Sequence, residues 1–382
     1  VYKRQLTPYN EAMTEAEVLE EGERCLNCVC GLCVDDCEFL TKYCDKSPKE
    51  LARMIKAGVE LPDTLQMTFS CNICSLCSRV CPENLDTGAM LLAARQEAQQ
   101  KVGSRPQHKP IVSYWKAGVA RMFSMVMPEP GRQKAKRLFF TGCALPAVMP
   151  NHAISVYNAL RQHYPGTGVL MLCCGAPVEL IGMEEQHHMN VEMLQRMVES
   201  VGAEELLPAC PDCAHALTES MPELKITPVW ELLADAWDPP RKREGVTVSI
   251  HDSCKAAHMP NLHDAVRTLI DKGGAEIDDI EYRRELARCC GFGGMIYPID
   301  AELSQKVTQR RANESEHPMV TYCAGCRMAL KGCGKESIHL LDLLYEDDWK
   351  KKANAAPPGA LGRYANRLMT KWRFKRLKPL TA

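Results

Sequence analysis

Cysteine is the residue type in this chain with the most chemical potential, and its 21 copies occur in close clusters. Ten lie within residues 25–81, five within 143–213 and five within 254–326. Disulfide-dense proteins are usually small and secreted, whereas this chain has 382 residues and opens without a signal-peptide pattern. Clustered cysteines in a reducing compartment typically bind metal or do redox chemistry. We therefore expect metal–thiolate sites rather than a disulfide framework.

The most regular cluster has the spacing Cys-x2-Cys-x2-Cys-x3-Cys-Pro and consists of Cys71, Cys74, Cys77, Cys81 and Pro82. In bacterial ferredoxins, three thiolates of such a run bind one cubane 4Fe–4S cluster, and the fourth binds the other cluster of a pair. A zinc site would use two pairs of ligands and would not need this spacing. The run therefore predicts iron–sulfur ligation.

A less regular run precedes it, with a wider middle gap, and consists of Cys25, Cys28, Cys33 and Cys37. This run, and the lead-in at 21–28, resemble the first run in the iron–sulfur domain of glutamate synthase small subunits and dihydropyrimidine dehydrogenase. Another register would use Cys30, but its first position would then be Asn27, so we favour Cys25 and Cys28.

The ferredoxin crossover rule divides these eight cysteines between two cubane 4Fe–4S clusters. One predicted ligand set is Cys25, Cys28, Cys33 and Cys81. The other is Cys71, Cys74, Cys77 and Cys37. Cys30 and Cys44 are expected to be small buried apolar residues, and Cys333 has no assigned role.

The two later blocks repeat one pattern: a single cysteine, an adjacent pair followed by glycine, and Cys-x-x-Cys. The first copy consists of Cys143, Cys173, Cys174, Cys210 and Cys213. The second consists of Cys254, Cys289, Cys290, Cys323 and Cys326, which lie 111 to 116 residues further on. A repeat of this length is the size of a domain, so we predict a duplicated domain rather than a solenoid.

Each copy is predicted to be α/β, because short apolar runs that suit buried strands precede most of its cysteines. These runs lie at 138–140, 169–172, 246–248 and 319–322. Ligands gather at the carboxyl ends of strands in open α/β sheets, so the cysteines should converge at one end of each sheet. No strand is evident before Cys289, because residues 283–285 are polar.

The expected fold is α+β / α/β, with a mostly helical dicluster ferredoxin-like domain followed by two α/β domains. Helices are predicted at about 86–100 and 111–126, and the Gly-Ser-Arg-Pro segment at 103–106 breaks the pattern near a domain edge. The predicted units are a dicluster domain (1–104), a linker (105–135), two repeat domains (136–242 and 243–350) and a basic C-terminal tail (351–382). The chain begins at Val1 rather than methionine, which is consistent with processing, trimming or a fragment.

The repeated pattern resembles the cysteine-rich CCG domains of heterodisulfide reductase and its relatives. A dicluster region followed by two CCG domains resembles the fused catalytic subunit of membrane-linked heterodisulfide reductase, and the likeness covers about residues 20–345. The resemblance implies that each five-cysteine set holds a noncubane 4Fe–4S cluster, made of two fused 2Fe–2S units. It also implies that the two clusters face each other and cleave a substrate disulfide. One departure is Ser253, where relatives usually have proline.

Two functions are therefore expected from different classes. The first is an iron–sulfur oxidoreductase subunit that passes electrons through two cubane clusters to the CCG clusters, which reduce or form a disulfide. The alternative is an electron-transfer subunit of a flavin-dependent glycolate, glycerol-3-phosphate or lactate dehydrogenase that delivers electrons to a quinone or another carrier. Relatives of that kind often have an eroded motif, whereas both motifs are complete here, so disulfide chemistry ranks first. A scaffold or sensor role ranks last.

Composition and further motifs limit the partners. The net charge of −1 argues against nucleic-acid binding, and no apolar stretch is long enough to span a membrane. No Gly-x-Gly-x-x-Gly fingerprint is present, so flavin or NAD is expected on a partner, such as a flavoprotein or another electron-donor subunit. The other expected partner is a small-molecule disulfide or thiol substrate. We expect a cytoplasmic protein, peripheral on the inner face of the membrane.

The basic C-terminal segment and a few histidines and glycines complete the candidates. Residues 363–378 contain seven basic side chains and no acid, so this segment is expected to contact anionic lipid, a membrane cytochrome or an acidic subunit, or to be a solvated tail. The histidines are poor catalytic candidates: 187–188 should face solvent, while His215 and His258 lie near cluster cysteines and could tune clusters or move protons. Glycines after the cysteine pairs should allow a turn, and 291–294 could approach a cluster or substrate.

Overall fold

The computed structural model describes residues 15–27, 30–35, 37–44, 51, 62–83 and 85–380, so that Cys28 lies outside the described part. The first cysteine block is helical where it is described. The carboxylate of Asp86 caps its longest helix by accepting a hydrogen bond from the Ala89 amide at 2.9 Å, close to the start predicted from the sequence. The helices are α1 (Glu15–Asn27), α2 (Leu32–Asp35), α3 (Glu38–Tyr43), α5 (Pro62–Ser70), α6 (Leu76–Val80) and α7 (Thr87–Val102).

The first repeat copy forms a five-stranded sheet in the order β1-β3-β2-β4-β5, in which only β1 is antiparallel to its neighbour. Its strands are β1 (Met125–Met127), β2 (Arg137–Phe140), β3 (Thr167–Met171), β4 (Glu205–Pro208) and β5 (Lys225–Ile226). Its helices are α9 (Leu145–Val148), α10 (Pro150–His163), α11 (Ala176–Glu179), α12 (Glu184–Val201), α13 (Pro211–Ser220) and α14 (Val229–Ala236).

The second copy forms a parallel four-stranded sheet in the order β7-β6-β8-β9, which matches β3-β2-β4-β5 of the first copy strand for strand. Its strands are β6 (Thr247–Ile250), β7 (Glu276–Ile277), β8 (Met319–Thr321) and β9 (Ser337–His339). Its helical elements are η2 (Cys254–Ala256), α15 (Pro260–Lys272), η3 (Arg284–Leu286), η4 (Gly293–Met295), α16 (Ala301–Ala312), α17 (Ala324–Gly332) and α18 (Leu340–Tyr345). The matching strand order is evidence of the duplication.

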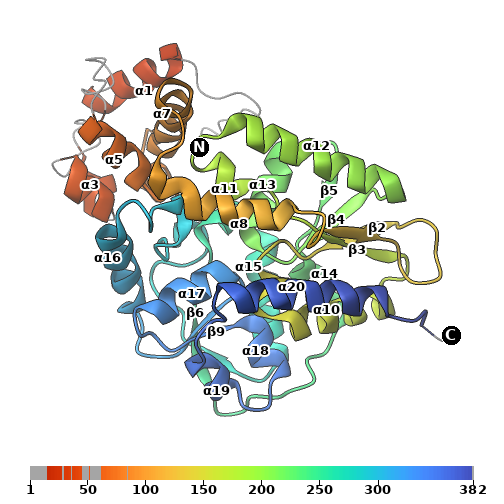
Figure 1. Cartoon of the computed structure of the whole chain (residues 1–382). Coiled ribbons are helices and arrows are strands. Elements are labelled where there is room, and N and C mark those ends of the chain that lie inside the picture. The colour runs from red at the N-terminus through yellow and green to blue at the C-terminus, as the bar shows by residue number, and fades with distance from the viewer. Residues whose placement is uncertain are drawn as a thin grey trace.

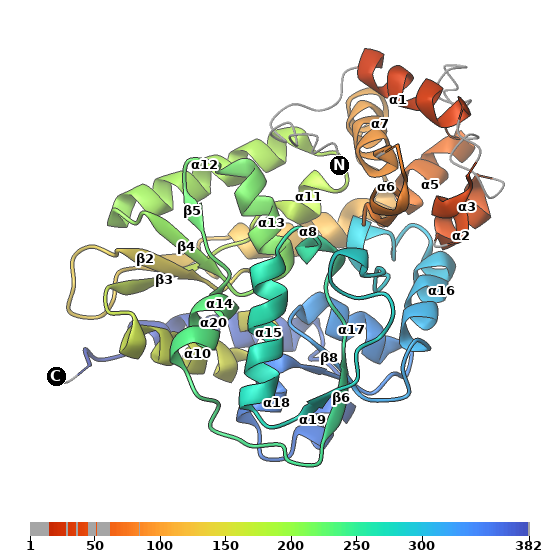
Figure 2. The same cartoon turned by 180° about the vertical axis from the view of Figure 1, so that it is seen from behind.

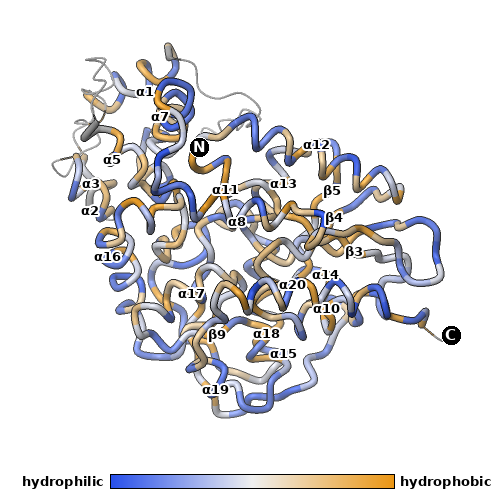
Figure 3. The backbone as a smooth tube through the Cα atoms, viewed as in Figure 1, coloured by the Kyte–Doolittle hydropathy of each residue, from blue (hydrophilic) through white to orange (hydrophobic). Residues whose placement is uncertain are grey.

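The two copies share one hydrophobic core. A single cluster of buried apolar side chains joins residues of the first copy, such as Tyr157 and Trp230, to residues of the second, such as Leu269 and Leu341. A buried hydrogen bond also crosses this interface, because His152 Nε2 lies 3.0 Å from Asp342 Oδ1 in the second copy. Figure 3 shows apolar stretches alternating with hydrophilic ones along the helices, and Figures 1 and 2 show the helical N-terminal part packed beside both copies.

Two segments differ from the sequence expectations. The helix predicted at about 111–126 is shorter, because α8 (Lys109–Val119) ends early and the chain turns back to add β1 to the first sheet. The predicted tail instead forms α19 (Trp349–Asn354) and α20 (Ala360–Lys375). Helix α20 packs against α9 and α10, where Thr370 and Phe374 are fully buried (Figure 1). A solvated tail is therefore wrong for this segment. No helix in the described part of the chain combines the length and apolarity needed to cross a bilayer.

Candidate functional site

The cysteines of both copies lie at the carboxyl ends of parallel strands, the edge of an open α/β sheet at which ligands bind. In the first copy, Cys143 follows β2, the adjacent pair follows β3, and Cys210 is the N-cap of α13. In the second copy, Cys323 is correspondingly the N-cap of α17. The pair at 289–290 follows a long loop rather than a strand, since the chain after β7 contains only the short turn η3.

Hydrogen bonds between thiols connect all ten of these cysteines, and we call this arrangement the thiol row. In the first copy the bonded order is Cys143, Cys173, Cys174, Cys213 and Cys210. The second copy has the mirrored order Cys323, Cys326, Cys290, Cys289 and Cys254. A hydrogen bond between Cys210 and Cys323 joins the copies at the centre of the row. The duplicated sets therefore meet across the domain interface.

The thiols in the row perturb one another's acidity. Hydrogen bonds from Cys289 and Cys326 lower the pKa of Cys290 to about 5, and bonds from Cys213 and Cys323 lower the pKa of Cys210 well below its usual value. The pKa of Cys326 is raised by its bonds to Cys290 and Cys323 and by burial. Within the row, the thiols with a lowered pKa therefore accept hydrogen bonds as thiolates, and the neighbours with a raised pKa donate them as thiols. Because metals bind thiolates, a row of buried thiols with displaced pKa values suits metal ligation.

Two groups of metal-capable atoms lie within the row, and both include residues that the sequence pattern did not assign. Asp212 Oδ2 accepts from the Cys323 thiol at 3.3 Å and lies 3.8 Å from Cys210 Sγ. Burial raises the pKa of this carboxyl to about 7. His251 forms a second group with Cys290 and Cys326, with ligand atoms within 4.8 Å of one another. In the sequence, Asp212 lies inside a Cys-x-x-Cys motif and His251 lies three residues before Cys254. These positions were the only signals in the sequence for a role of either residue in metal binding.

Glycines leave room around the row. The turns predicted after the cysteine pairs are present, since Gly175 and Gly291 have φ of +93° and +84°. Gly142, with φ of +64°, faces Cys213, and a Cβ there would lie 3.1 Å from the sulfur. A Cβ on Gly118 of α8 would lie 2.9 Å from the Cβ of Cys173. These close backbone approaches fit a bulky group bound among the sulfurs.

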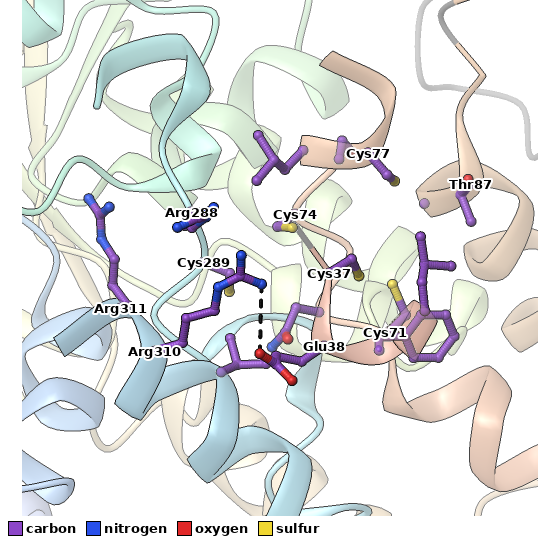
Figure 4. Close-up of a pocket in the computed structure, with 17 residues that line it drawn as sticks. Cys37, Glu38, Cys71, Cys74, Cys77, Thr87, Arg288, Cys289, Arg310 and Arg311 are labelled. Atoms are coloured by element: carbon purple, nitrogen blue, oxygen red, sulfur yellow. Dashed lines mark ion pairs between the residues drawn. The ribbon is translucent and has the colours of Figure 1, made fainter. Parts of the chain in front are cut away.

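One of the two predicted cubane ligand sets converges on a pocket. Its lining includes the four cysteines of that set, together with cysteine and arginine side chains of the second copy (Figure 4). Ile73 and Ser75 have φ of 48° and 56°, a left-handed backbone that is uncommon for such residues and that coils the run around the pocket. Burial raises the pKa of Cys71 to about 11. The cysteines concerned are Cys37, Cys71, Cys74 and Cys77.

The other predicted set is only partly brought together in the described residues. Cys25 and Cys81 contact one small apolar cluster around Leu85, whereas Cys33 packs against another cluster that contains Phe39. Cys28 lies outside the described residues. Of the cysteines without a role, Cys44 is buried as expected, Cys333 is half-buried and Cys30 is exposed. The expectation for Cys30 was wrong, because it lies on the surface loop that precedes α2.

The pocket set adjoins one end of the thiol row. Cys289 lines the pocket itself, and Cys74 interacts electrostatically with Cys254. Figure 4 shows Cys289 and Cys74 from different domains approaching one another beside Arg288. The second copy is therefore next to the dicluster part, and Cys143 of the first copy lies at the far end of the row.

The histidine predictions had mixed outcomes. His188 is exposed on α12 as expected, but His187 is half-buried, and its Nδ1 lies 2.9 Å from the position of a Cβ on Gly175. His215 is half-buried near Lys255 and His258, and burial holds its pKa well below the usual value. At neutral pH its imidazole is therefore uncharged.

Family models match most of the cysteine-bearing parts of the chain. Residues 24–86 match a 4Fe-4S dicluster domain, and residues 137–218 and 248–331 each match the cysteine-rich CCG domain. The two CCG matches contain the two halves of the thiol row and the central strands of the two sheets, whereas β1, β5 and β9 lie outside them.

Three curated relatives align with most of this chain and with most of their own length. A fumarate reductase (CoM/CoB) subunit of Methanothermobacter marburgensis is 24% identical, with 87% of this chain and 75% of the relative covered. A dihydromethanophenazine:CoB–CoM heterodisulfide reductase subunit of Methanosarcina mazei is also 24% identical, with 75% and 78% covered. The glycolate oxidase iron-sulfur subunit of Escherichia coli is 23% identical, with 87% and 97% covered. The chain is thus a heterodisulfide reductase-like iron–sulfur electron-transfer protein, with a dicluster domain followed by two CCG domains.

Proposed function

We propose that this chain belongs to an oxidoreductase complex in which its paired CCG sites reduce or form a small-molecule disulfide. The observation that carries the proposal is the thiol row, in which two complete five-cysteine sets meet at Cys210 and Cys323. A disulfide takes two electrons, whereas iron–sulfur clusters pass one at a time, so its cleavage calls for two adjacent sites. The names of two relatives, which refer to a heterodisulfide and to CoM/CoB, support this class of substrate.

The proposed cofactors are two cubane 4Fe–4S clusters in the dicluster domain and one or two noncubane-type 4Fe–4S clusters in the CCG domains. When bound, these clusters supply one-electron transfer. The chain's residues would hold them in order: the pocket set of Cys37, Cys71, Cys74 and Cys77 lies beside the second CCG set, which lies beside the first. Their donor chemistry fits, because every member is a cysteine and burial or hydrogen bonding perturbs their pKa values. The remaining cubane is assigned to Cys25, Cys28, Cys33 and Cys81.

A second function is supported by the glycolate oxidase relative, 97% of whose length is covered. In that case the chain would carry electrons from a flavin-dependent dehydrogenase to a quinone or another carrier, and the central pair of sets would bind no disulfide. The two functions differ in whether the cluster irons at the thiol row are open to a sulfur ligand.

The deciding experiment is spectroscopic. We expect the anaerobically reconstituted protein, titrated with a small-molecule disulfide, to show a new paramagnetic signal that is absent in the Cys210→Ala variant. Cys333→Ala serves as the matched control, because its half-buried sulfur is outside both sets and donates to the Leu330 carbonyl. A wild-type protein that carries only cubane clusters, or that responds to no disulfide or thiol, would leave the electron-conduit function standing alone.

For partners, we propose a flavoprotein or other electron-donor subunit and an anionic membrane surface that α20 contacts. One side of α20 is buried, whereas large apolar residues at helical spacing face solvent on the other: Leu361, Leu368, Met369 and Trp372 are 85%, 43%, 42% and 53% exposed. Basic side chains and no acids flank this stripe. An amphipathic helix of this kind suits the headgroup region of an anionic bilayer and would give a peripheral location.

A further inference from the structure

Helix α20 also contacts the thiol row, through the side chain of Arg367. This side chain is 2% exposed, although it is a cation, and it belongs to a helix outside both CCG matches. Its Nε–H donates to the Cys143 carbonyl at 3.1 Å. The guanidinium carbon lies 5.0 Å from the ring centroid of Tyr114. Arg367 is thus held against the far end of the first five-cysteine set.

The guanidinium is only partly satisfied. Both terminal nitrogens, Nη1 and Nη2, are buried and have no hydrogen-bond partner in the described structure. Burying a cation without a counter-charge is costly, and a planar guanidinium offers several donors that suit an anion. The ligand that lies against it is Cys143, because the Nε–H of the same guanidinium donates to the carbonyl of that residue. Tyr114 completes the arrangement, since its hydroxyl accepts a hydrogen bond from Cys143 Sγ at 3.4 Å.

From this geometry we propose that Arg367 is a positioning and charge-compensating residue for the anionic cluster bound by the first CCG set. The inference rests on the proposed function, because it requires a cluster at that set. An iron–sulfur cluster with thiolate ligands carries net negative charge, and both its charge and its hydrogen bonds set its reduction potential. A fixed cation stabilises the reduced form, which has one more negative charge. Arg367 therefore raises the potential of this cluster.

The effect is specific to one copy. In the described part of the chain, α20 contacts the first set, whereas Cys254 at the opposite end of the row lies against the dicluster pocket. The two CCG clusters would then differ in potential, although the sequence repeats their cysteines. The second set has a different cation beside it, because Lys255 interacts electrostatically with Cys254.

The test compares wild type with Arg367→Met, Arg367→Lys and a matched control on the same helix, Arg373→Met. Arg373 is half-exposed and its guanidinium donates to Asn151 rather than toward the row. Each protein is reconstituted anaerobically, its iron is counted, and its potentials are titrated by electron paramagnetic resonance. We expect Arg367→Met to lower the potential of one cluster signal, Arg367→Lys to restore most of the shift, and Arg373→Met to leave every potential unchanged.

Several outcomes would overturn the proposal. Equal potentials in Arg367→Met and wild type, at equal iron content and equal thermal stability, would show that the guanidinium does not face the cluster. An unchanged potential with a raised KM for an acidic disulfide would assign Arg367 to the substrate instead. If Arg367→Met loses iron, Arg367→Lys carries the test of potential. A wild-type protein with about eight iron atoms, the content of two cubanes alone, would reject the proposed function rather than the assignment of Arg367.

Discussion

Single residues join parts of this molecule that are far apart in the sequence, and Arg95 of α7 does so most completely. It is fully buried, and its guanidinium donates to four main-chain carbonyls, those of Thr68, Cys71, Leu180 and Gly294. These carbonyls belong to the dicluster part and to both CCG copies. Arg95 therefore links the dicluster part to both CCG copies, next to the main chain of Cys71 in the pocket set.

We predict that Arg95→Met lowers the free energy of unfolding by on the order of 3–5 kcal/mol, because four buried carbonyls lose their donor. Arg95→Lys should recover only part of this loss, since an ammonium on a flexible stem cannot reproduce the guanidinium fork. Thermal and denaturant unfolding of the reconstituted protein measures the effect. Arg196→Met, on an exposed ion pair of α12, is the control and should change stability by no more than about 0.5 kcal/mol. Equal losses in both variants would contradict the role of Arg95.

At the residue scale, the sequence identified the cysteines as candidate metal ligands but not the residues that surround them. Spacing selected the candidate ligand cysteines, and the fold brings those of the two CCG domains together in the thiol row. Arg95, Asp212 and Arg367 carried no such signal, since each acts through contacts with residues from other elements. Arg367 lies 224 residues from the carbonyl that it contacts. Such pairings depend on the packing of whole elements, which no local pattern encodes.

At the scale of elements, the predictable parts were those with strong local signals. The four apolar runs became β2, β3, β6 and β8, and the Ala-rich segment became α7. The early end of α8 was not foreseen, because the following residues form an antiparallel edge strand only in the presence of β3. The C-terminal helix was not predicted either, because its many basic residues are typical of a solvated tail. Its buried face forms only where α20 packs against α9 and α10.

Gly118 gives a test at this scale, because it lies inside α8 yet faces the thiol row. Glycine within a helix is usually less stable than alanine by about 1 kcal/mol, so an ordinary substitution would stabilise the protein. Here the added Cβ would lie 2.9 Å from the Cβ of Cys173. We predict that Gly118→Ala instead destabilises the protein by about 1–3 kcal/mol and reduces the iron bound per chain.

The matched control is Gly332→Ala at the end of α17, where nothing lies within 4 Å of the added Cβ. That variant should keep full iron content and lose no stability. Unfolding curves and iron analysis of the two variants, prepared side by side, provide the comparison. A Gly118→Ala protein with unchanged iron and higher stability would mean that α8 can move away from Cys173 without consequence.

At the scale of the whole molecule, the duplication makes two similar sites that have unlike surroundings. The second copy contacts the dicluster part through α3 and α16, where Lys42 and Tyr43 bind Asp300 at 2.8 and 2.5 Å. The first copy contacts the dicluster part at Leu180, whose carbonyl accepts from Arg95, and it is also covered by α8 and α20. Sequence repetition predicts the symmetry of the cysteines, whereas the asymmetry arises from segments that are not repeated. The two ends of the thiol row therefore differ, with the dicluster pocket at one end and α20 at the other.

That end also carries the surface proposed to contact a membrane. The exposed stripe of α20 includes Trp372, over whose ring the Arg376 guanidinium lies at 3.7 Å. We predict that the full chain sediments with vesicles of anionic phosphatidylglycerol and far less with neutral phosphatidylcholine. The binding should weaken in about 0.5 M salt, because screening shortens the reach of the basic side chains. Trp372→Ser combined with Leu368→Ser should abolish binding, since apolar insertion and charge act together.

The control for this experiment is Tyr297→Ser, which removes an aromatic side chain that is 69% exposed in the second copy, away from α20. It should bind vesicles as wild type does. A Lys375→Glu and Arg376→Glu double variant separates the two contributions, because it keeps the apolar stripe and reverses two of its flanking charges; it should lose the preference for anionic lipid. Equal binding to neutral and anionic vesicles, or wild-type binding by the Trp372 and Leu368 variant, would contradict a lipid role for α20 and leave its apolar stripe to a protein partner.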